Sequence, residues 1–124
     1  MTKKVLVIDN DTDTLDTLER KLRDRGMVPV VLRRGVSAKQ KVKDEKPGAV
    51  VMELTLPDQD GRAVIRELKD DWEAKKVPIV VLSNYPNRID HATREKVAGV
   101  FAKPADFEEV FARLQRAMAE AEKS

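Results

Sequence analysis

The sequence AVVMELTLPDQDG, residues 49–61, combines a short apolar run, an acidic residue and a loop of turn-forming residues. Its first four residues, Ala49–Met52, are all apolar, as in a parallel strand that is covered on both faces. Glu53 follows directly, and Pro57 and Gly61 are typical of a turn. This stretch therefore predicts a buried strand that brings a carboxylate to the carboxyl edge of a sheet.

Segments of strand and helix character alternate along the rest of the chain. The other apolar or β-branched runs lie at residues 5–8, 28–32, 78–82 and 99–102. Between them, apolar residues spaced three and four apart predict helices: one with Leu15, Leu18 and Leu22 that ends at Gly26, a weaker one over 35–46, one through Val64, Ile65 and Leu68 with Trp72 packing one turn further on, a short one through Ile89 and Ala92, and a last one from Phe107 to Met118. This alternation predicts one α/β domain over residues 1–124, with a parallel sheet and a polar tail at 119–124.

Pro29 limits where the second strand can lie in this sheet. A proline has no backbone N–H to donate to a neighbouring strand, so within sheets it is confined to edge strands, strand starts and bulges. We therefore expect residues 28–32 to form an edge strand.

The composition excludes several classes of function. The chain has no cysteine and a single histidine, His91, which rules out disulfide frameworks, thiol chemistry and histidine-rich metal sites. The formal net charge of +2 gives no strong field toward nucleic acid or an anionic membrane. No apolar run approaches the ~20 residues that a membrane-spanning helix needs, and the apolar residues that follow Lys4 are too few for a signal peptide. The default expectation is a cytoplasmic protein without a membrane partner.

Polar residues interrupt the chain at the carboxyl ends of four strands. In an open parallel sheet, ligands bind beyond these ends, at the point where the strand order reverses. A charge attached to an apolar strand is costly unless it is paired, so Glu53 and Lys103 are expected to pair. Simpler roles stay open for two others, because Asp11 could cap a helix and Ser83 could serve a turn. The candidate site residues are Asp9, Asn10, Asp11, Glu53, Ser83 and Lys103.

The order and spacing of these residues resemble the receiver domain of bacterial response regulators, which act in two-component and phosphorelay signal transduction. The resemblance covers nearly the whole chain and is carried by Asp9-Asn10, Glu53, Leu56-Pro57-x-x-x-Gly61, Ser83 and Lys103-Pro104. It implies a flavodoxin-like, doubly wound (βα)5 fold with a parallel sheet in the strand order 2-1-3-4-5, in which the second strand is an edge. It also implies a cis peptide bond between Lys103 and Pro104.

By the same resemblance, working receivers take a phosphoryl group from a kinase phosphohistidine onto an aspartate after the third strand. An acidic pair after the first strand holds Mg²⁺, and Ser83 and Lys103 correspond to the residues that bind phosphoryl oxygens. In this chain Glu53 replaces the acceptor aspartate and Asn10 replaces the second acid of the metal pair. Val100 stands at the position of the family's switch aromatic, and the segment between Ser83 and Lys103 is shorter than is usual in the family.

These departures predict a pseudo-receiver that acts through protein contacts, is not an enzyme and is not phosphorylated in the usual way. Glutamate is one methylene longer than aspartate, and a misplacement of ~1 Å can cost ~100-fold in a transfer reaction. With Asn10 in the metal pair, Asp9 is left as the ligand of a weak or absent Mg²⁺ site, and no other cofactor is expected. As a hypothesis, Glu53 imitates part of the phosphorylated state. The expected partners are a histidine kinase, a phosphotransfer protein or a downstream effector.

Three alternatives stay open at this point. The chain could be a conditionally phosphorylated regulator that uses Glu53, Asp58 or Asp60. Asp9-Asn10-Asp11 also has the form of the DxD motif of small aspartate-dependent phosphatases, although that family wants threonine or valine where Asp13 stands. A basic cluster around the second helix could bind nucleic acid, but no aromatic residue interleaves it, and a solvated surface is favoured: Arg33, Arg34, Lys39, Lys41, Lys43 and Lys46.

Overall fold

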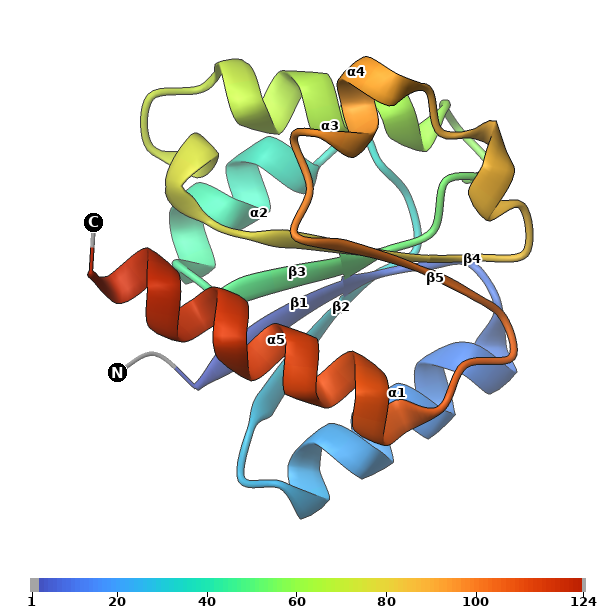
Figure 1. Cartoon of the computed structure of the whole chain (residues 1–124), viewed down its shortest axis with the longest axis vertical. Coiled ribbons are helices and arrows are strands. Elements are labelled where there is room, and N and C mark those ends of the chain that lie inside the picture. The colour runs from blue at the N-terminus through green and yellow to red at the C-terminus, as the bar shows by residue number, and fades with distance from the viewer. Residues whose placement is uncertain (1–2, 124) are drawn as a thin grey trace.

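The computed structural model describes residues 3–123, and Figure 1 shows how their helices and strands are arranged. The strands form one parallel sheet in the order β2-β1-β3-β4-β5, which confirms the predicted flavodoxin-like fold. Along the chain the elements are β1 (Lys4–Ile8), α1 (Thr12–Asp24), β2 (Val28–Leu32), α2 (Ala38–Glu45), β3 (Ala49–Met52), α3 (Gly61–Asp70), the 3₁₀ helix η1 (Ala74–Lys76), β4 (Ile79–Ser83), the 3₁₀ helix η2 (Pro86–Arg88), α4 (His91–Arg94), β5 (Gly99–Ala102) and α5 (Phe107–Glu122).

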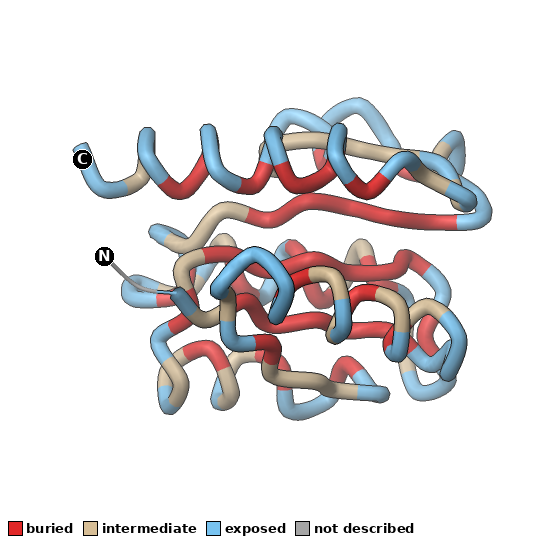
Figure 2. The backbone as a smooth tube through the Cα atoms, turned by 90° about the horizontal axis from the view of Figure 1, so that it is seen from below, coloured by how far each residue is buried: buried red, intermediate tan, exposed pale blue. Residues whose placement is uncertain are grey.

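Helices cover both faces of the sheet. α1 and α5 lie on one face, and α2, α3 and α4 lie on the other (Figure 1). β3 is central, with Val51 in register between Val7 of β1 and Val80 of β4. Its side chains alternate, because Val50 and Met52 join the core under α2 and α3, whereas Val51 joins the core under α1 and α5. Both faces of the central strands are therefore buried, as Figure 2 shows.

β2 lies at an edge of the sheet and pairs with β1, which confirms the prediction from Pro29. The Val28 N–H donates to the Lys3 carbonyl at 2.8 Å, and the Asp9 N–H donates to the Leu32 carbonyl at 3.0 Å. Because successive residues of a strand direct their backbone groups to opposite sides, Pro29 presents its missing donor to the open edge. The proline thus removes one donor from the row to which another strand could pair.

Aspartates begin four of the helices. Asp11, Asp60, Asp90 and Asp106 are the residues that precede α1, α3, α4 and α5, and each side chain accepts a hydrogen bond from a backbone N–H in the first turn. Such a cap satisfies a donor that has no partner inside the helix, and each contributes roughly 1 kcal/mol. These caps set where the chain turns from the carboxyl edge of the sheet into a helix.

α2 begins at Ala38 rather than at Gly35, where the sequence predicted its start. The carboxylate of Asp58 accepts hydrogen bonds from the N–H groups of Gly35 (2.9 Å) and Val36 (2.8 Å). The Asp58 carboxylate thereby satisfies two amides that lie just ahead of α2. This contact ties the β2–α2 loop to the loop that follows Glu53.

α3 ends at Asp70, and the prediction that Trp72 packs one turn further along this helix is wrong. The carboxylate of Asp71 accepts from the N–H groups of Glu73 (3.0 Å) and Ala74 (2.8 Å), which starts the separate turn η1. Trp72 lies between the two helices with 75% of its surface exposed.

α5 runs through most of the segment predicted as a polar tail, because it continues to Glu122 with Lys123 as its cap. Ser124 lies outside the described residues. The buried face of α5 includes Phe107, Leu114 and Met118, as the helical spacing predicted. No helix within residues 3–123 has both the length and the apolar character needed to cross a membrane.

The contact between Asp58 and the β2–α2 loop predicts a dependence of stability on pH. The Gly35 N–H lowers the pKa of the Asp58 carboxyl below its ordinary value of 3.8, and the Val36 N–H adds to this. A carboxyl with a lowered folded pKa contributes stability that is complete above the unfolded value and is lost as the pH falls through the folded value. In urea unfolding between about pH 7 and about pH 3, the free energy of unfolding should therefore fall less for Asp58→Asn than for the wild type.

Asp24→Asn is the matched control, because it removes the same charge from an exposed position at the end of α1. Its free energy of unfolding should fall between neutral and acid pH by as much as that of the wild type. An Asp58→Asn variant with an unchanged acid loss would contradict the assignment of this contact.

Candidate functional site

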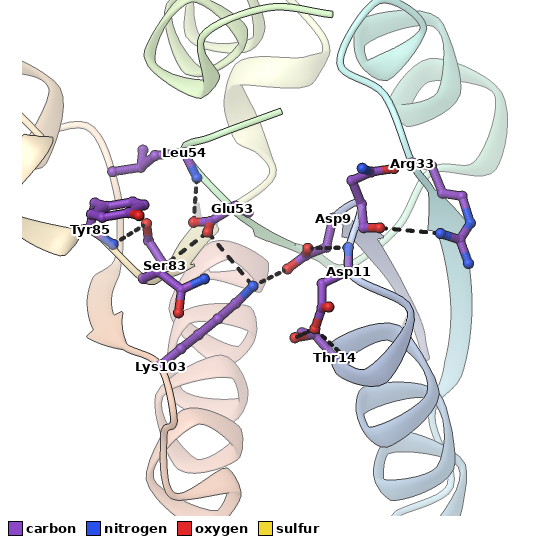
Figure 3. Close-up of polar contacts among 11 residues, drawn as sticks. Asp9, Asp11, Thr14, Arg33, Glu53, Leu54, Ser83, Tyr85 and Lys103 are labelled. Carbon is purple, nitrogen blue, oxygen red and sulfur yellow. Dashed lines mark hydrogen bonds and ion pairs between the residues drawn. The ribbon is translucent and has the colours of Figure 1, made fainter. Parts of the chain in front are cut away.

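The predicted site residues lie together at the carboxyl edge of the sheet (Figure 3). Asp9 follows β1, Glu53 follows β3, Ser83 is the last residue of β4 and Lys103 follows β5. Parallel strands end at the same edge, so four positions that are far apart in sequence converge. Asp9 and Glu53 are each only 4% exposed, and Ser83 is fully buried.

Lys103 extends between two buried carboxylates. Its Nζ donates to Oδ2 of Asp9 at 2.8 Å and lies 3.7 Å from Oε1 of Glu53. The closer partner is thus Asp9, a pairing that the sequence did not single out. One ammonium group serves both carboxylates, which offsets much of the cost of burying them. The peptide bond between Lys103 and Pro104 is cis, as the resemblance implied.

Backbone N–H groups hold the carboxylate of Glu53 on its other sides. Oε2 accepts from the N–H of Leu54 at 2.8 Å, and Oε1 accepts from the N–H of Asn84 at 3.3 Å. Two backbone donors and the more distant ammonium of Lys103 therefore surround this carboxylate. Sequence reasoning missed Leu54 and Asn84, since a main-chain donor leaves no signal in residue type and only the fold brings it to the site.

The acidic segment after β1 divides between the site and the start of α1. Oδ1 of Asp9 accepts from the N–H of Asp11 at 2.9 Å. The carboxylate of Asp11 instead accepts from Oγ1 (2.6 Å) and the N–H (3.0 Å) of Thr14, and this hydroxyl lowers the pKa of the Asp11 carboxyl. Asp11 therefore has the helix-capping role that the sequence left open. Asn10 is exposed, and its carbonyl accepts from Arg33 at 3.3 Å.

Ser83 and Tyr85 organise the loop after β4. Ser83 Oγ accepts from the N–H of Tyr85 at 3.0 Å, which fixes the turn that also presents the N–H of Asn84 to Glu53. Tyr85 is 46% exposed, and the guanidinium of Arg88 lies 4.1 Å from the centre of its ring. The tyrosine therefore stands at the rim of the site as a cation–π pair.

Val100 and Phe101 of β5 pack on opposite faces of the sheet. Val100 packs against the core under α2 and α3, while Phe101 packs against the core under α1 and α5. This follows from the alternation of side chains along a strand. The position that corresponds to the family's switch aromatic is therefore filled by a small, partly buried aliphatic side chain.

The site opens to solvent through a pocket of about 290 Å³ that borders both Asp9 and Glu53. A hard dication such as Mg²⁺ binds through several oxygen ligands, chiefly carboxylates. Within residues 3–123, no group of three or more histidine, cysteine or acidic side chains is placed to hold a metal ion. Oδ2 of Asp9 is engaged by Lys103, so this donor set fits a dication poorly.

An acidic pocket bridged by a lysine, at the edge of a parallel sheet with the strand order 2-1-3-4-5, defines a receiver-type signalling domain. The family model of the response regulator receiver domain matches residues 5–115. The chain belongs to this family, whose members act in two-component signalling.

Known proteins of this family are similar over nearly the whole chain. Over 122 residues the chain is 30% identical to the response regulator MprA of Mycobacterium ulcerans (strain Agy99), and the match covers 93% of this chain and 50% of that protein. The chain thus spans about half the length of this relative.

Solved structures share the fold. A sensor protein from Polaromonas sp. JS666 superposes with a TM-score of 0.88 at 26% identity, covering 95% of this chain and 97% of that one. The receiver domain of the sensor histidine kinase PA1611 from Pseudomonas aeruginosa PAO1 superposes with a TM-score of 0.82 at 22% identity, covering 96% and 99%. That domain was solved with a magnesium ion coordinated in its active site cleft.

Proposed function

We propose that this receiver domain is a pseudo-receiver, which transmits a signal through contacts with protein partners and is not phosphorylated in the usual way. The observation that carries the proposal is the surroundings of Glu53. Its carboxylate already accepts hydrogen bonds from the N–H groups of Leu54 and Asn84, and it lies 3.7 Å from the ammonium of Lys103. A carboxylate held in this way is a poor acceptor, because its oxygens are turned toward donors rather than toward an incoming phosphoryl group.

The same contacts favour a fixed imitation of part of the phosphorylated state. By the family resemblance, the lysine after β5 and the residues after β4 contact phosphoryl oxygens in a working receiver. Here Oε1 of Glu53 accepts a hydrogen bond from the N–H of Asn84 and faces Lys103. The extra methylene of glutamate carries the carboxylate about 1 Å further from the strand than aspartate would, which is enough to disturb in-line transfer.

We propose that Mg²⁺ binds weakly or not at all. The Pseudomonas aeruginosa receiver domain holds Mg²⁺ in its cleft. In this chain the second acid of the pair is replaced by Asn10, and the ammonium of Lys103 lies 2.8 Å from Oδ2 of Asp9. A positive charge at that place disfavours a second cation, because like charges repel strongly at such short range.

The expected protein partner has a groove beside the site in which to dock. A cavity of about 440 Å³ lies between α1 and the β5–α5 connection, and its wall includes Leu18, Lys21, Phe107 and Val110. It joins an apolar floor to a polar rim, which is the composition of many protein interfaces. We propose that a histidine kinase or phosphotransfer protein contacts the domain here, and that effectors are the other class of partner.

A conditionally phosphorylated regulator is the second candidate, and the aspartates after β3 argue against it. The carboxylate of Asp58 holds the β2–α2 loop. That of Asp60 caps α3 and forms an ion pair with Arg62 at 2.7 Å. Each has a structural role that phosphorylation would remove, so we do not propose either as an acceptor.

Phosphatase and nucleic-acid functions receive less support. A DxD phosphatase needs both aspartates of its motif free for catalysis, whereas Asp9 is bound to Lys103 and Asp11 caps α1. The basic residues of α2 are partly neutralised, because Lys41 pairs with Glu45 and Lys43 pairs with Asp71. We therefore propose that the domain itself is neither a phosphatase nor a nucleic-acid-binding module.

Labelling with acetyl phosphate and Mg²⁺ tests the proposal. Intact-mass measurement should show no added phosphoryl group on the wild type, whereas Asn10→Asp/Glu53→Asp should become labelled. The expected gain is ~100-fold or more in the labelling rate, since the double variant restores both the in-line geometry and the second acid. A Mg²⁺ titration followed by NMR should show binding in the double variant and little in the wild type.

Asn10→Asp/Glu53→Asn is the matched control, because it restores the acid at position 10 while removing the acceptor. It should stay unlabelled. Stable labelling of the wild type at Glu53 would refute the proposal and establish conditional phosphorylation instead.

A further inference from the structure

A second surface lies at the opposite end of the sheet from Glu53. It is a groove of about 220 Å³ between the end of α2 and η1. Pro47 precedes β3 and Val77 precedes β4, so the groove borders the amino ends of two of the strands whose carboxyl ends carry the site. Val42, Pro47 and Val77 form its apolar floor.

Lysines dominate the rim of this groove. Lys43, Lys46 and Lys76 line it together with one acidic residue, Glu73. Lys43 is partly neutralised by Asp71 at 3.4 Å. Lys46 and Lys76 are exposed, and neither forms an ion pair with another residue in the range 3–123. The groove therefore offers an apolar floor with positive charge around it.

Trp72 precedes Glu73, which lines the groove, and is not itself one of the lining residues. It is the chain's single tryptophan, and 75% of its surface is exposed. The Nζ of Lys75 lies 4.1 Å from the centre of its ring. An exposed tryptophan is typical of the residues that dominate binding energy in interfaces.

The loop that carries Trp72 is held firmly from both sides. Asp71 accepts from the N–H groups of Glu73 and Ala74 and pairs with Lys43 of α2. Lys69 of α3 donates to the carbonyls of Lys75 and Val77, each at 3.1 Å. The exposed ring therefore sits on a preformed platform, and little ordering entropy would be lost when a partner binds.

We propose that this groove and Trp72 dock an acidic, extended segment of a partner protein that carries an apolar side chain. The carboxylates of the segment would pair with Lys46 and Lys76. Its apolar side chain would cover the floor and pack against Trp72. This surface is independent of the pocket around Glu53, so the two ends of the domain contact different partners or different parts of one partner.

An acidic peptide suits this groove better than a nucleic acid does. Single-stranded nucleic acid needs a positive track with several stacking platforms, one for each of successive bases. Here one aromatic ring is available, and Glu73 and Asp71 interrupt the positive charge. The groove also has an apolar floor, which an aliphatic side chain can cover and a phosphate backbone cannot.

The fluorescence of Trp72 provides the test, because no other tryptophan contributes. The full chain is titrated with a short, end-blocked peptide of alternating glutamate and leucine. We expect a blue shift and saturable binding. The same peptide with glutamine in place of glutamate should bind at least tenfold more weakly. Oligo(dT) should leave the emission unchanged at equal concentration.

The key variant is Lys46→Gly/Lys76→Gln. Lys46 has a φ of 50°, which glycine adopts readily, so the variant should fold. We expect at least a tenfold loss of peptide affinity. Lys96→Gln/Lys123→Gln is the matched control, since it removes two exposed lysines elsewhere, and it should bind like the wild type.

Four outcomes would overturn the proposal: no change in Trp72 emission, equal losses in both double variants, tighter binding of oligo(dT) than of the acidic peptide, or a blue shift that appears with protein concentration alone. The third would identify the groove as a nucleic-acid site. The fourth would show that a second copy of the chain covers it.

Discussion

Lys103→Met should lower the free energy of unfolding by about 3–5 kcal/mol, because it leaves a buried charge cluster without its cation. Methionine keeps an apolar stem of similar length to that of lysine and lacks the ammonium. Asp9 and Glu53, each 4% exposed, would then face each other with no positive charge between them. Urea unfolding followed by circular dichroism at neutral pH measures the loss.

The Asp9→Asn/Lys103→Met double variant separates charge from packing. Removing one of the two carboxylates should recover a large part of the lost stability, because a single carboxylate remains and it keeps its backbone donors. If the double variant is as unstable as Lys103→Met alone, the loss comes from packing of the lysine stem. The shared-cation description of the site would then be wrong.

Gly61→Ala should cost about 3 kcal/mol, at the upper end of what overpacking a tight contact usually costs. A Cβ at position 61 would lie 2.7 Å from the carbonyl oxygen of Glu53 and 2.7 Å from both Cα and the carbonyl oxygen of Leu54. These are backbone atoms, so the clash cannot be relieved by turning a side chain. The N–H of Gly61 also donates to the Leu54 carbonyl at 2.6 Å, which holds the two segments together.

Gly26→Ala is the control for glycine replacement in general. Gly26 has a φ of +79° and open space where a Cβ would be, so only the backbone conformation opposes alanine. The expected cost is about 1 kcal/mol. Comparable losses at both glycines would contradict the close approach at Gly61.

The Gly61→Ala change should also shift the amide resonances of Leu54 and Asn84, since it moves the strand end that carries Glu53.

Much of the fold could be predicted from local patterns. The apolar run Ala49–Met52 is buried on both faces, and Pro29 lies in an edge strand. Both follow from physics that acts within a few residues, namely the alternation of side chains along a strand and the missing N–H of proline. The departures from expectation have local and distant causes. Asp71 starts η1 by accepting from the N–H of Ala74, three residues on, whereas Asp58 holds the N–H of Gly35 from 23 residues away.

The residue types at the site were also readable from the sequence, because a carboxylate or lysine that ends an apolar strand is conspicuous. The contacts that these residues make at the site could not be read from the sequence. Lys103 lies closer to Asp9, 94 positions away in the chain, than to the expected Glu53. The ends of β1 and β3 are level, with Ile8 in register with Met52, so only the assembled sheet brings both carboxylates within reach of Lys103.

Glu53 also shows the difference between what the sequence determines and what the folded structure decides. The sequence by itself determined that a buried strand carries a carboxylate to the edge of a parallel sheet, in place of the aspartate that the family uses there. Only the packed structure decided that the N–H groups of Leu54 and Asn84 hold this carboxylate, and that Trp72 stands exposed at the opposite end. Residue type and spacing act locally, whereas main-chain donors and surface exposure depend on which segments the fold brings together.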